Sequence, residues 1–156
     1  MRGPIAFREM AAGDEQGVSA LIEEVFNEFI APDYAPGGIE EFKKHIVPED
    51  LLRRHERGDS FILLAEEDGE LVGVIDVRDG SHIRLFFVRK DHHGKGVGRN
   101  LFDLSLERCR RDDPALEEIT VNSSPYAIHI YENLGFTVAG PERTRNGMRH
   151  IPMAYR

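Results

Sequence analysis

The sequence lacks several features that would each assign the protein to a particular class. It contains one cysteine, Cys109, so an internal disulfide is excluded and a reducing compartment, the cytoplasm, is expected. No apolar run approaches the ~20 residues of a membrane-spanning helix, and the first ten residues hold no continuous apolar stretch of the secretory type. No membrane partner is therefore expected, and Cys109 is expected to be a buried core thiol.

Positive charge is also in short supply. The 20 Lys and Arg residues are outnumbered by 28 Asp and Glu residues, which gives a formal net charge of −8. Binding to nucleic acid requires clustered cations that contact phosphates, so no nucleic-acid partner is expected. The long-range field of an acidic protein weakly favours a cationic substrate. The length suits a single domain over residues 1–156.

The first third of the chain is predicted to be mainly helical. A short strand at 5–9 precedes a region, 18–30, in which apolar residues recur every three or four positions. Asp14 is the candidate N-cap of this helix. A weaker helical region over 39–52 is expected to be interrupted at Pro48.

The middle of the chain changes to the pattern of strands. Three short runs rich in aliphatic and aromatic residues, 61–67, 70–78 and 82–88, are separated by Asp-Gly pairs at 68–69 and 79–80. Asp-Gly is a favoured pair in two-residue hairpin turns. The pattern predicts an antiparallel meander of three strands.

A second well-formed helix is predicted to start at Val97 and to end before Pro114. The segment 117–122 reads as a strand. A short helix should follow it, with Ser124 as N-cap and Gly135 as C-cap.

Two strands are predicted at the end of the chain, over 136–140 and 148–156, joined through the hairpin signal Asn-Gly at 146–147. Pro152 cannot donate a ladder hydrogen bond, so the last strand is expected to be an edge strand or to contain a bulge. The elements together predict one mixed α/β (α+β) domain.

The stretch HHGKGVGRNLF has three glycines around the start of a predicted helix. The first N–H groups of a helix have no internal partner, and glycines let a ligand approach them, so the stretch predicts a phosphate site with Lys95 and Arg99 nearby. A P-loop is excluded because Gly96, not Ser or Thr, follows Lys95. A dinucleotide fingerprint fails because Arg99 stands in the sixth position from Gly94. The alternative is a tight strand-to-helix turn.

Two segments resemble motifs of the GNAT acetyltransferase superfamily. Residues 93–98, HGKGVG, are similar to motif A, Gln/Arg-x-x-Gly-x-Gly/Ala, with His93 where glutamine or arginine is usual. The segment SPYAIHIYENLGF resembles motif B, with Ser124 in place of the usual asparagine. The residues in register with motif B are Ala127, Ile130, Tyr131, Gly135 and Phe136.

The resemblance implies a mostly antiparallel central sheet of six to seven strands, flanked by about four helices and splayed between the fourth and fifth strands. It implies that acetyl-CoA is the co-substrate and that Phe87 and Val88 line the notch for its pantetheine arm, which Asn122 or Ser124 contacts. The loop residues assigned to its pyrophosphate region are His93, Gly94, Lys95, Gly96, Val97, Gly98 and Arg99.

The activity implied by the resemblance is N-acetylation of a primary amine, of a small molecule or a peptide, by direct attack on the thioester. The Val88 N–H would stabilise the developing oxyanion, and Tyr131 would act as general acid. Tyr131 packing on the sheet is the structural alternative. The sequence does not identify the general base. His82 is the first candidate, and a histidine that merely faces solvent at the start of a strand is an equal alternative. The rival bases are Asp76, Glu28 and His150.

The alternative function is a non-catalytic acyl-CoA sensor on the same fold. No metal is expected, because His92 and His93 have no further ligands at zinc spacing. The exposed final strands are compatible with a homodimer.

Overall fold

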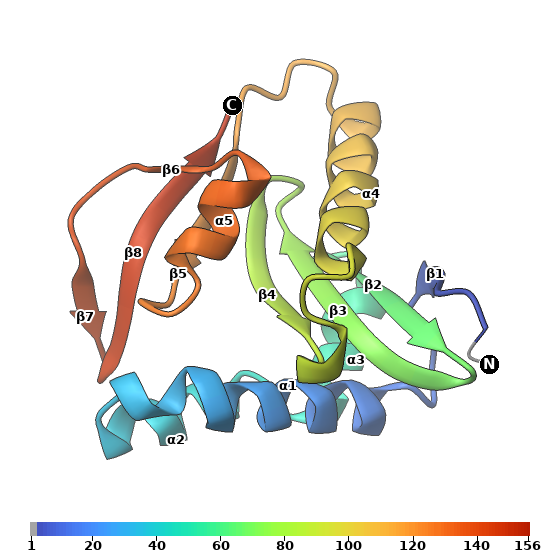
Figure 1. Cartoon of the computed structure of the whole chain (residues 1–156). Helices are drawn as coiled ribbons and strands as arrows, with labels where there is room; N and C mark the ends of the chain where they lie inside the picture. Colours follow the sequence, from blue (N-terminus) through green and yellow to red (C-terminus); the bar gives the residue numbers. More distant parts are fainter. Residues whose placement is uncertain (1–2) are drawn as a thin grey trace.

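The computed structural model describes residues 3–156, which form one eight-stranded sheet with helices on both faces (Figure 1). The helices are α1 (Glu15–Phe29), α2 (Pro36–Lys44), α3 (Pro48–Glu56), α4 (Val97–Asp112) and α5 (Ile128–Leu134), with the 3₁₀ turns η1 (Ala31–Asp33) and η2 (Lys90–His92). The strands are β1 (Ala6–Glu9), β2 (Ser60–Glu67), β3 (Glu70–Arg78), β4 (His82–Val88), β5 (Ile119–Ser123), β6 (Thr137–Val138), β7 (Arg143–Arg145) and β8 (Met148–Tyr155).

The strand order is β1-β2-β3-β4-β5-β8-β6, and β7 pairs with β8. Every neighbouring pair is antiparallel except β4 and β5, which run parallel. The predicted mixed, mostly antiparallel architecture is thus confirmed. The described residues have five α-helices where about four were expected, because the helical region over 39–52 divides at Pro48 into α2 and α3. They have eight strands where six to seven were expected, and one of these, β7, is only three residues long. No helix within 3–156 is long and apolar enough to span a membrane.

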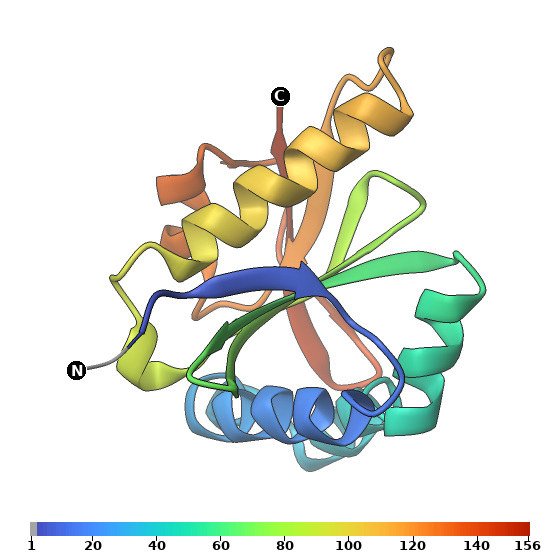
Figure 2. The ribbon, with the colours of Figure 1, turned by 90° about the vertical axis from the view of Figure 1, so that its right-hand side faces the viewer.

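The sheet separates two apolar cores. Figure 2 shows α1 and α4 on opposite faces of the sheet. On one face, α1 buries its apolar stripe, including Ile22 and Phe26, against the sheet. On the other face, α4 packs Leu101 and Phe102 in a cluster that also contains Tyr131 of α5. Because β2 and β3 are covered on both faces, they read as nearly continuous apolar runs rather than alternating ones.

The predicted meander is present as β2, β3 and β4. Asp68, Gly69, Asp79 and Gly80 all have positive φ, between 52° and 82°, as the central residues of primed turns require. The first loop has the two residues 68–69, whereas Arg78 pairs with His82 and the second loop has the three residues 79–81. Cys109 is 1% exposed, as expected for a core thiol, and burial raises its pKa to about 11.

Two expected caps are different in the structure. Asp14 stands at the N-cap of α1 but makes no cap hydrogen bond, because its carboxylate accepts bonds from the Arg8 guanidinium at 2.7 and 2.9 Å. Ser124 does not begin α5. Its Oγ and its carbonyl accept the Ala127 N–H at 3.2 and 3.1 Å, which makes a separate turn, and the helix starts at Ile128.

The C-terminal hairpin also differs from the prediction. The Asn-Gly turn at 146–147 joins β7 to β8, whereas β6 pairs with the other end of β8. Pro152 lies in an inner strand, between β5 and β6, rather than at an edge. Its carbonyl accepts the Ala139 N–H at 2.8 Å, so its missing N–H faces the same side, next to the point where β6 ends at Val138.

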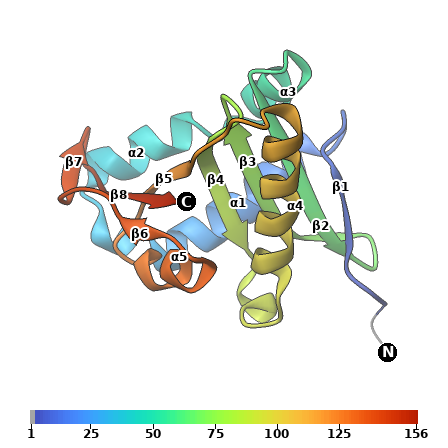
Figure 3. The same ribbon diagram turned by 90° about the horizontal axis from the view of Figure 1, so that it is seen from above.

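The splay predicted between the fourth and fifth strands is confirmed. β4 and β5 are paired only through His82–Thr120 and Ile83–Val121 and then separate. The ladder between β3 and β4 shifts register here, because Asp76 pairs with Leu85 and Val77 with Ile83, which leaves Arg84 as an extra residue. Such a bulge bends a strand and increases its twist. Seen from above, α4 lies over the β2–β4 half of the sheet and α5 over the other half (Figure 3).

Candidate active site

A pocket of about 490 Å³ occupies the region where β4 and β5 separate. Its wall combines residues of α1, the C-terminal end of β4, the β4–α4 loop, the start of α4 and the segment 126–134. Val25 and Ile30 belong to the core on the α1 face, whereas Tyr131 and Leu134 belong to the core on the α4 face. The pocket therefore reaches from one face of the sheet to the other through the gap between β4 and β5, which we call the opening.

Most residues that the motifs assign to the cofactor line this pocket: Phe87, Val88, His93, Gly94, Gly96, Val97, Gly98, Arg99 and Tyr131. Lys95 is exposed on the same loop. Asn122 is exposed on β5, and Ser124 follows that strand, its hydroxyl bonded to the Ala127 N–H. Neither lies in the wall of the pocket, so contact of Asn122 or Ser124 with a pantetheine arm stays a prediction.

The glycine loop has the backbone of an anion site. Gly94 and Gly96 adopt positive φ of 76° and 83°, and Lys95 between them does not. Alternating handedness of this kind aims successive N–H groups into one concavity, and the first amides of α4, from Val97, add to it. A Cβ placed on Gly94 or Gly96 would meet nothing within 4 Å. The loop residues thus fit a diphosphate, which would occupy this open space.

His93 and His92 serve the loop in different ways. His93, at the position that departs from motif A, donates from Nε2 to the Val88 carbonyl at 2.6 Å. His92 is 1% exposed and lies between two carboxylates, with Nδ1 2.7 Å from Asp91 and Nε2 3.3 Å from Glu67. His92 thereby ties the loop to the β2–β3 hairpin. The sequence assigned His93 to the glycine loop through its resemblance to motif A and considered His92 only as a possible metal ligand. No cluster of three His, Cys, Asp or Glu residues that could hold a metal ion occurs within residues 3–156.

The free edge of β4 directs two backbone N–H groups into the opening. The Arg89 N–H donates to the Val72 carbonyl at 2.8 Å, so the next pair, Val88 with Gly73, is a non-hydrogen-bonded pair of the antiparallel ladder. The N–H of Val88 therefore points away from β3. By the same alternation the N–H of Phe86 points there too, closer to where β5 leaves. Sequence reasoning identified Val88 and missed Phe86.

Tyr131 lies in an aromatic corner on the α4 side of the pocket. Its ring centroid is 6.1 Å from that of Phe86 and 5.3 Å from that of Phe136, and the residue is 6% exposed. Burial raises the pKa of the phenol above its usual value near 10. Tyr131 is therefore protonated over the physiological range, so its hydroxyl is able to donate a hydrogen bond or a proton.

The candidate bases do not line the pocket. His82 lies six residues before Val88, about 20 Å along the strand, and its Nδ1 is 2.8 Å from Thr120 Oγ1. Burial lowers its pKa to about 4, which makes it a poor base near neutral pH. The structure thus separates His82 from the site, because the pocket forms only where β4 has left β5.

The three rival bases have other surroundings. Asp76 is fully buried and paired with Arg54 at 3.3 Å. Glu28 pairs with Lys90 at 2.7 Å, and His150 lies on β8 in register with Arg143 of β7.

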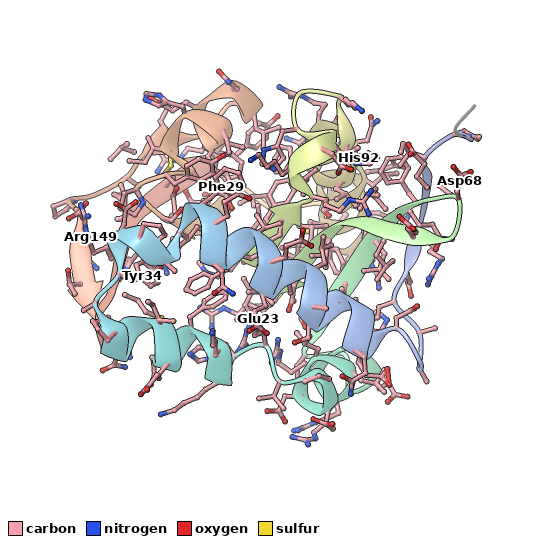
Figure 4. All side chains as sticks on the ribbon, turned by 60° about the horizontal axis from the view of Figure 1, so that its bottom comes forward. Glu23, Phe29, Tyr34, Asp68, His92 and Arg149 are labelled. Carbon is pink, nitrogen blue, oxygen red and sulfur yellow. The ribbon has the colours of Figure 1, made fainter. Side chains whose placement is uncertain are left out.

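Contacts between distant segments close the site, and sequence reasoning missed them. Phe29, at the end of α1 on the side away from α2 (Figure 4), stacks on Tyr126 with ring centroids 4.9 Å apart, and it lies 5.4 Å from the His93 ring. Arg99 at the start of α4 donates to the Asn133 carbonyl at 2.6 Å, near the end of α5. The periodic pattern of each helix contains no signal for such pairings.

Comparison with known proteins agrees with this geometry. The family model described as an acetyltransferase (GNAT) domain matches residues 30–156, which is more than half of the chain. A PaiA N-acetyltransferase from Thermoplasma acidophilum, solved in complex with coenzyme A, is similar over 99% of both chains, with a TM-score of 0.82 and 18% identity. A GCN5-related N-acetyltransferase from Rhodopseudomonas palustris has a TM-score of 0.77 and 20% identity over 99% of this chain and 97% of its own.

At such identities the solved structures establish a shared fold, and the family model covers both motifs and the splayed strands. The chain belongs to the GNAT acetyltransferase family.

Proposed function

We propose that the protein is an acetyl-CoA-dependent N-acetyltransferase that acts on a primary amine, which attacks the thioester directly in a complex with both substrates. The observation that carries this proposal is the continuity of one pocket through the sheet. A single space is lined by the glycine loop on the α4 side and by Val25 and Ile30 of α1 on the other. Two substrates can therefore enter from opposite faces and meet at the free edge of β4.

The glycine loop would hold the diphosphate of the co-substrate. The amides around Gly94 and Gly96 supply the donors, and the neighbouring Lys95 and Arg99 add positive charge. The complex of the Thermoplasma neighbour with coenzyme A supports the assignment of this ligand class.

The edge of β4 would stabilise charge in the reaction. Acetyl-CoA supplies an activated thioester carbonyl, whose oxygen becomes more negative as an amine attacks. The N–H groups of Val88 and Phe86 face the opening and are proposed as the donors to that oxygen. Fixed backbone donors do not have to reorganise during the reaction, which makes them effective at this task.

Tyr131 is proposed to donate its hydroxyl proton toward the departing sulfur. Its raised pKa argues for a strong hydrogen bond rather than complete transfer, because a phenol above pKa 10 holds its proton more firmly than a thiol near ~8.5. None of the four candidate bases lines the pocket. Water is therefore proposed to take up the proton that the substrate ammonium loses before the neutral amine attacks.

The proposal is tested by two measurements on the intact protein. Acetyl-CoA should raise the melting temperature, since it binds the folded state alone. A panel of primary amines should then release free thiol from acetyl-CoA at a rate that depends on the amine. A melting shift without thiol release for any amine would favour the acyl-CoA sensor, and no shift at all would contradict both functions.

A further inference from the structure

The bulge in β4 places a basic side chain at the inner end of the opening. Arg84 is the extra residue of this bulge and directly follows Ile83, the last residue of β4 that pairs with β5. Its guanidinium lies on the face that α2 and α3 cover, because Nη2 is 3.5 Å from Nδ1 of His45, the C-cap of α2. Arg84 therefore lies where the opening begins, on the face of the sheet that α1, α2 and α3 cover.

The charges around Arg84 do not balance. Asp76, the buried carboxylate nearby, pairs with Arg54 of α3 at 3.3 Å. Within residues 3–156, no carboxylate lies within the 4.0 Å of an ion pair with Arg84. Arg84 is nevertheless half-buried. Its pKa is lowered, mainly by burial and secondly by the positive charge of Arg54. Charged groups that leave water normally acquire a counter-ion.

His45 cannot be that counter-ion. To accept a hydrogen bond from Arg84 at Nδ1, the ring must be neutral and carry its proton on Nε2, which faces Glu41 at 3.9 Å. Burial and the nearby Arg84 both lower the pKa of His45, which agrees with the neutral form. The other charged groups that act on Arg84 are Arg54, Asp76 and Arg78, so three arginines face one carboxylate and the group has two cations in excess.

We infer that Arg84 binds an anionic group of the acceptor, and that the acceptor class is therefore amines that carry a carboxylate, such as amino acids or peptides with a free C-terminus. This inference rests on the proposed function. Phe86, whose N–H points away from β3 and is the proposed donor to the thioester oxygen, is two residues from Arg84, about 7 Å along the strand. Arg84 lies beyond the wall of the pocket, of which Phe86 is the nearest residue on β4. An acceptor with its amine at Phe86 therefore has to extend its carboxylate along β4 to reach Arg84. The exposed Asn122, across the opening on β5, alternates with the buried Val121 of the α4-side core, so it is on the same face as Arg84.

Arg84→Gln tests the inference against Arg78→Gln, a matched control that removes the same charge from the exposed end of β3. The acceptors are one amino acid, its carboxamide and a dipeptide with a free carboxylate. The wild type and Arg78→Gln should prefer a carboxylate to the carboxamide by roughly 10- to 100-fold in kcat/KM, mainly through KM. Arg84→Gln should lose that preference and leave the carboxamide unaffected. The distance between amine and carboxylate is longer in the dipeptide than in the amino acid. Their relative kcat/KM values therefore show whether the carboxylate belongs to an amino acid or to a peptide C-terminus.

Equal use of carboxylate and carboxamide by the wild type, or a preference that survives Arg84→Gln, would overturn the inference. If Arg84→Gln does not fold, Arg84→Lys keeps the charge without the bidentate geometry and should keep part of the preference. A binding measurement separates this failure from that of the proposed function. With coenzyme A present, the amino acid should raise the melting temperature of the wild type and of Arg78→Gln more than that of Arg84→Gln, even if no amine is acetylated.

Discussion

The two edges of β4 are paired in opposite ways. Toward β3 the ladder runs from Gly73–Val88 to Arg78–His82, with a single bulge. Toward β5 only His82–Thr120 and Ile83–Val121 are paired, and the rest of the edge is open. A strand edge without a partner exposes donors and acceptors that must be satisfied in another way. The candidate site therefore includes backbone N–H groups of β4 that have no partner strand.

Two glycines near β4, Gly73 on the closed side and Gly96 on the open side, are required for different physical reasons. On the closed side, a Cβ on Gly73 would lie 3.0 Å from Leu101 and 3.1 Å from Val97, so this glycine lets α4 pack closely on β3. On the open side, Gly96 has open space around its missing Cβ and is needed for its positive φ. The first glycine is required by packing and the second by backbone conformation and by the ligand.

The largest effect expected at the open edge follows from Tyr131→Phe. Loss of the hydroxyl should lower kcat by roughly 100-fold, within the range of general acid catalysis. The ring and its contacts with Phe86 and Phe136 remain, so the melting shift produced by coenzyme A should be kept. Tyr155→Phe is the matched control. Its ring centroid lies 5.6 Å from that of Phe136, and Tyr155 does not line the pocket. Equal turnover in both variants would assign Tyr131 to packing alone.

A smaller effect should separate backbone conformation from ligand binding in the glycine loop. Gly96→Ala and Gly80→Ala both put a side chain at positive φ, 83° and 68°, with nothing within 4 Å of the new Cβ. Each should lower the free energy of unfolding by about 1 kcal/mol. Only Gly96→Ala should also weaken the binding of coenzyme A, by about tenfold, because its methyl group occupies the ligand's space.

Calorimetric titration of both variants with coenzyme A gives the two affinities, and urea unfolding gives the two stabilities. Equal affinities would mean that the loop amides do not hold the diphosphate.

Local patterns predicted the elements and the motif-bearing loop, and they failed where a distant contact decides the structure. The three- and four-residue spacing of α1 and α4 and the Asp-Gly turns needed no tertiary information. The start of α5 did, because Ser124 closes a turn of its own. Gly38 and Gly147 are another case, since a Cβ on Gly38 would lie 2.1 Å from the Gly147 carbonyl oxygen, and this approach joins α2 to the final hairpin.

The candidate site was predictable to the same extent. Residues 93–98 and Tyr131 could be found because each motif is contiguous, and all but Lys95 line the pocket. The base could not be found, because the type of a residue on a strand does not reveal its distance from the pocket. His82 and Asp76 are both chemically suitable, yet one lies at the far end of β4 and the other is paired in the core. The bulge at Arg84 depends on the register between two strands, which no local pattern contains.

The smallest predicted effect concerns His82, at the end of β4 where both edges are still paired. Because the folded-state pKa is lowered to about 4 from 6.5, the unfolded chain takes up this proton first as the pH falls. The contribution of His82 to stability is present above pH 6.5 and is lost as the pH falls toward 4. His82→Gln should therefore lose less stability than the wild type between pH 7 and pH 4. The difference should be about 1 kcal/mol, below the full value of the shift, because the imidazole is partly exposed.

Urea unfolding at the two pH values measures this difference, and His129→Gln is the control, since its side chain is 92% exposed. Glutamine can still bond to Thr120, which lies 2.8 Å from the imidazole, so the β4–β5 pairing should survive. If the pH dependence of stability is the same in His82→Gln and the wild type, the imidazole is solvated, and β4 and β5 are not paired at His82. If the pH dependence is reduced in His82→Gln, the imidazole is buried between the paired strands, and the opening begins at Arg84.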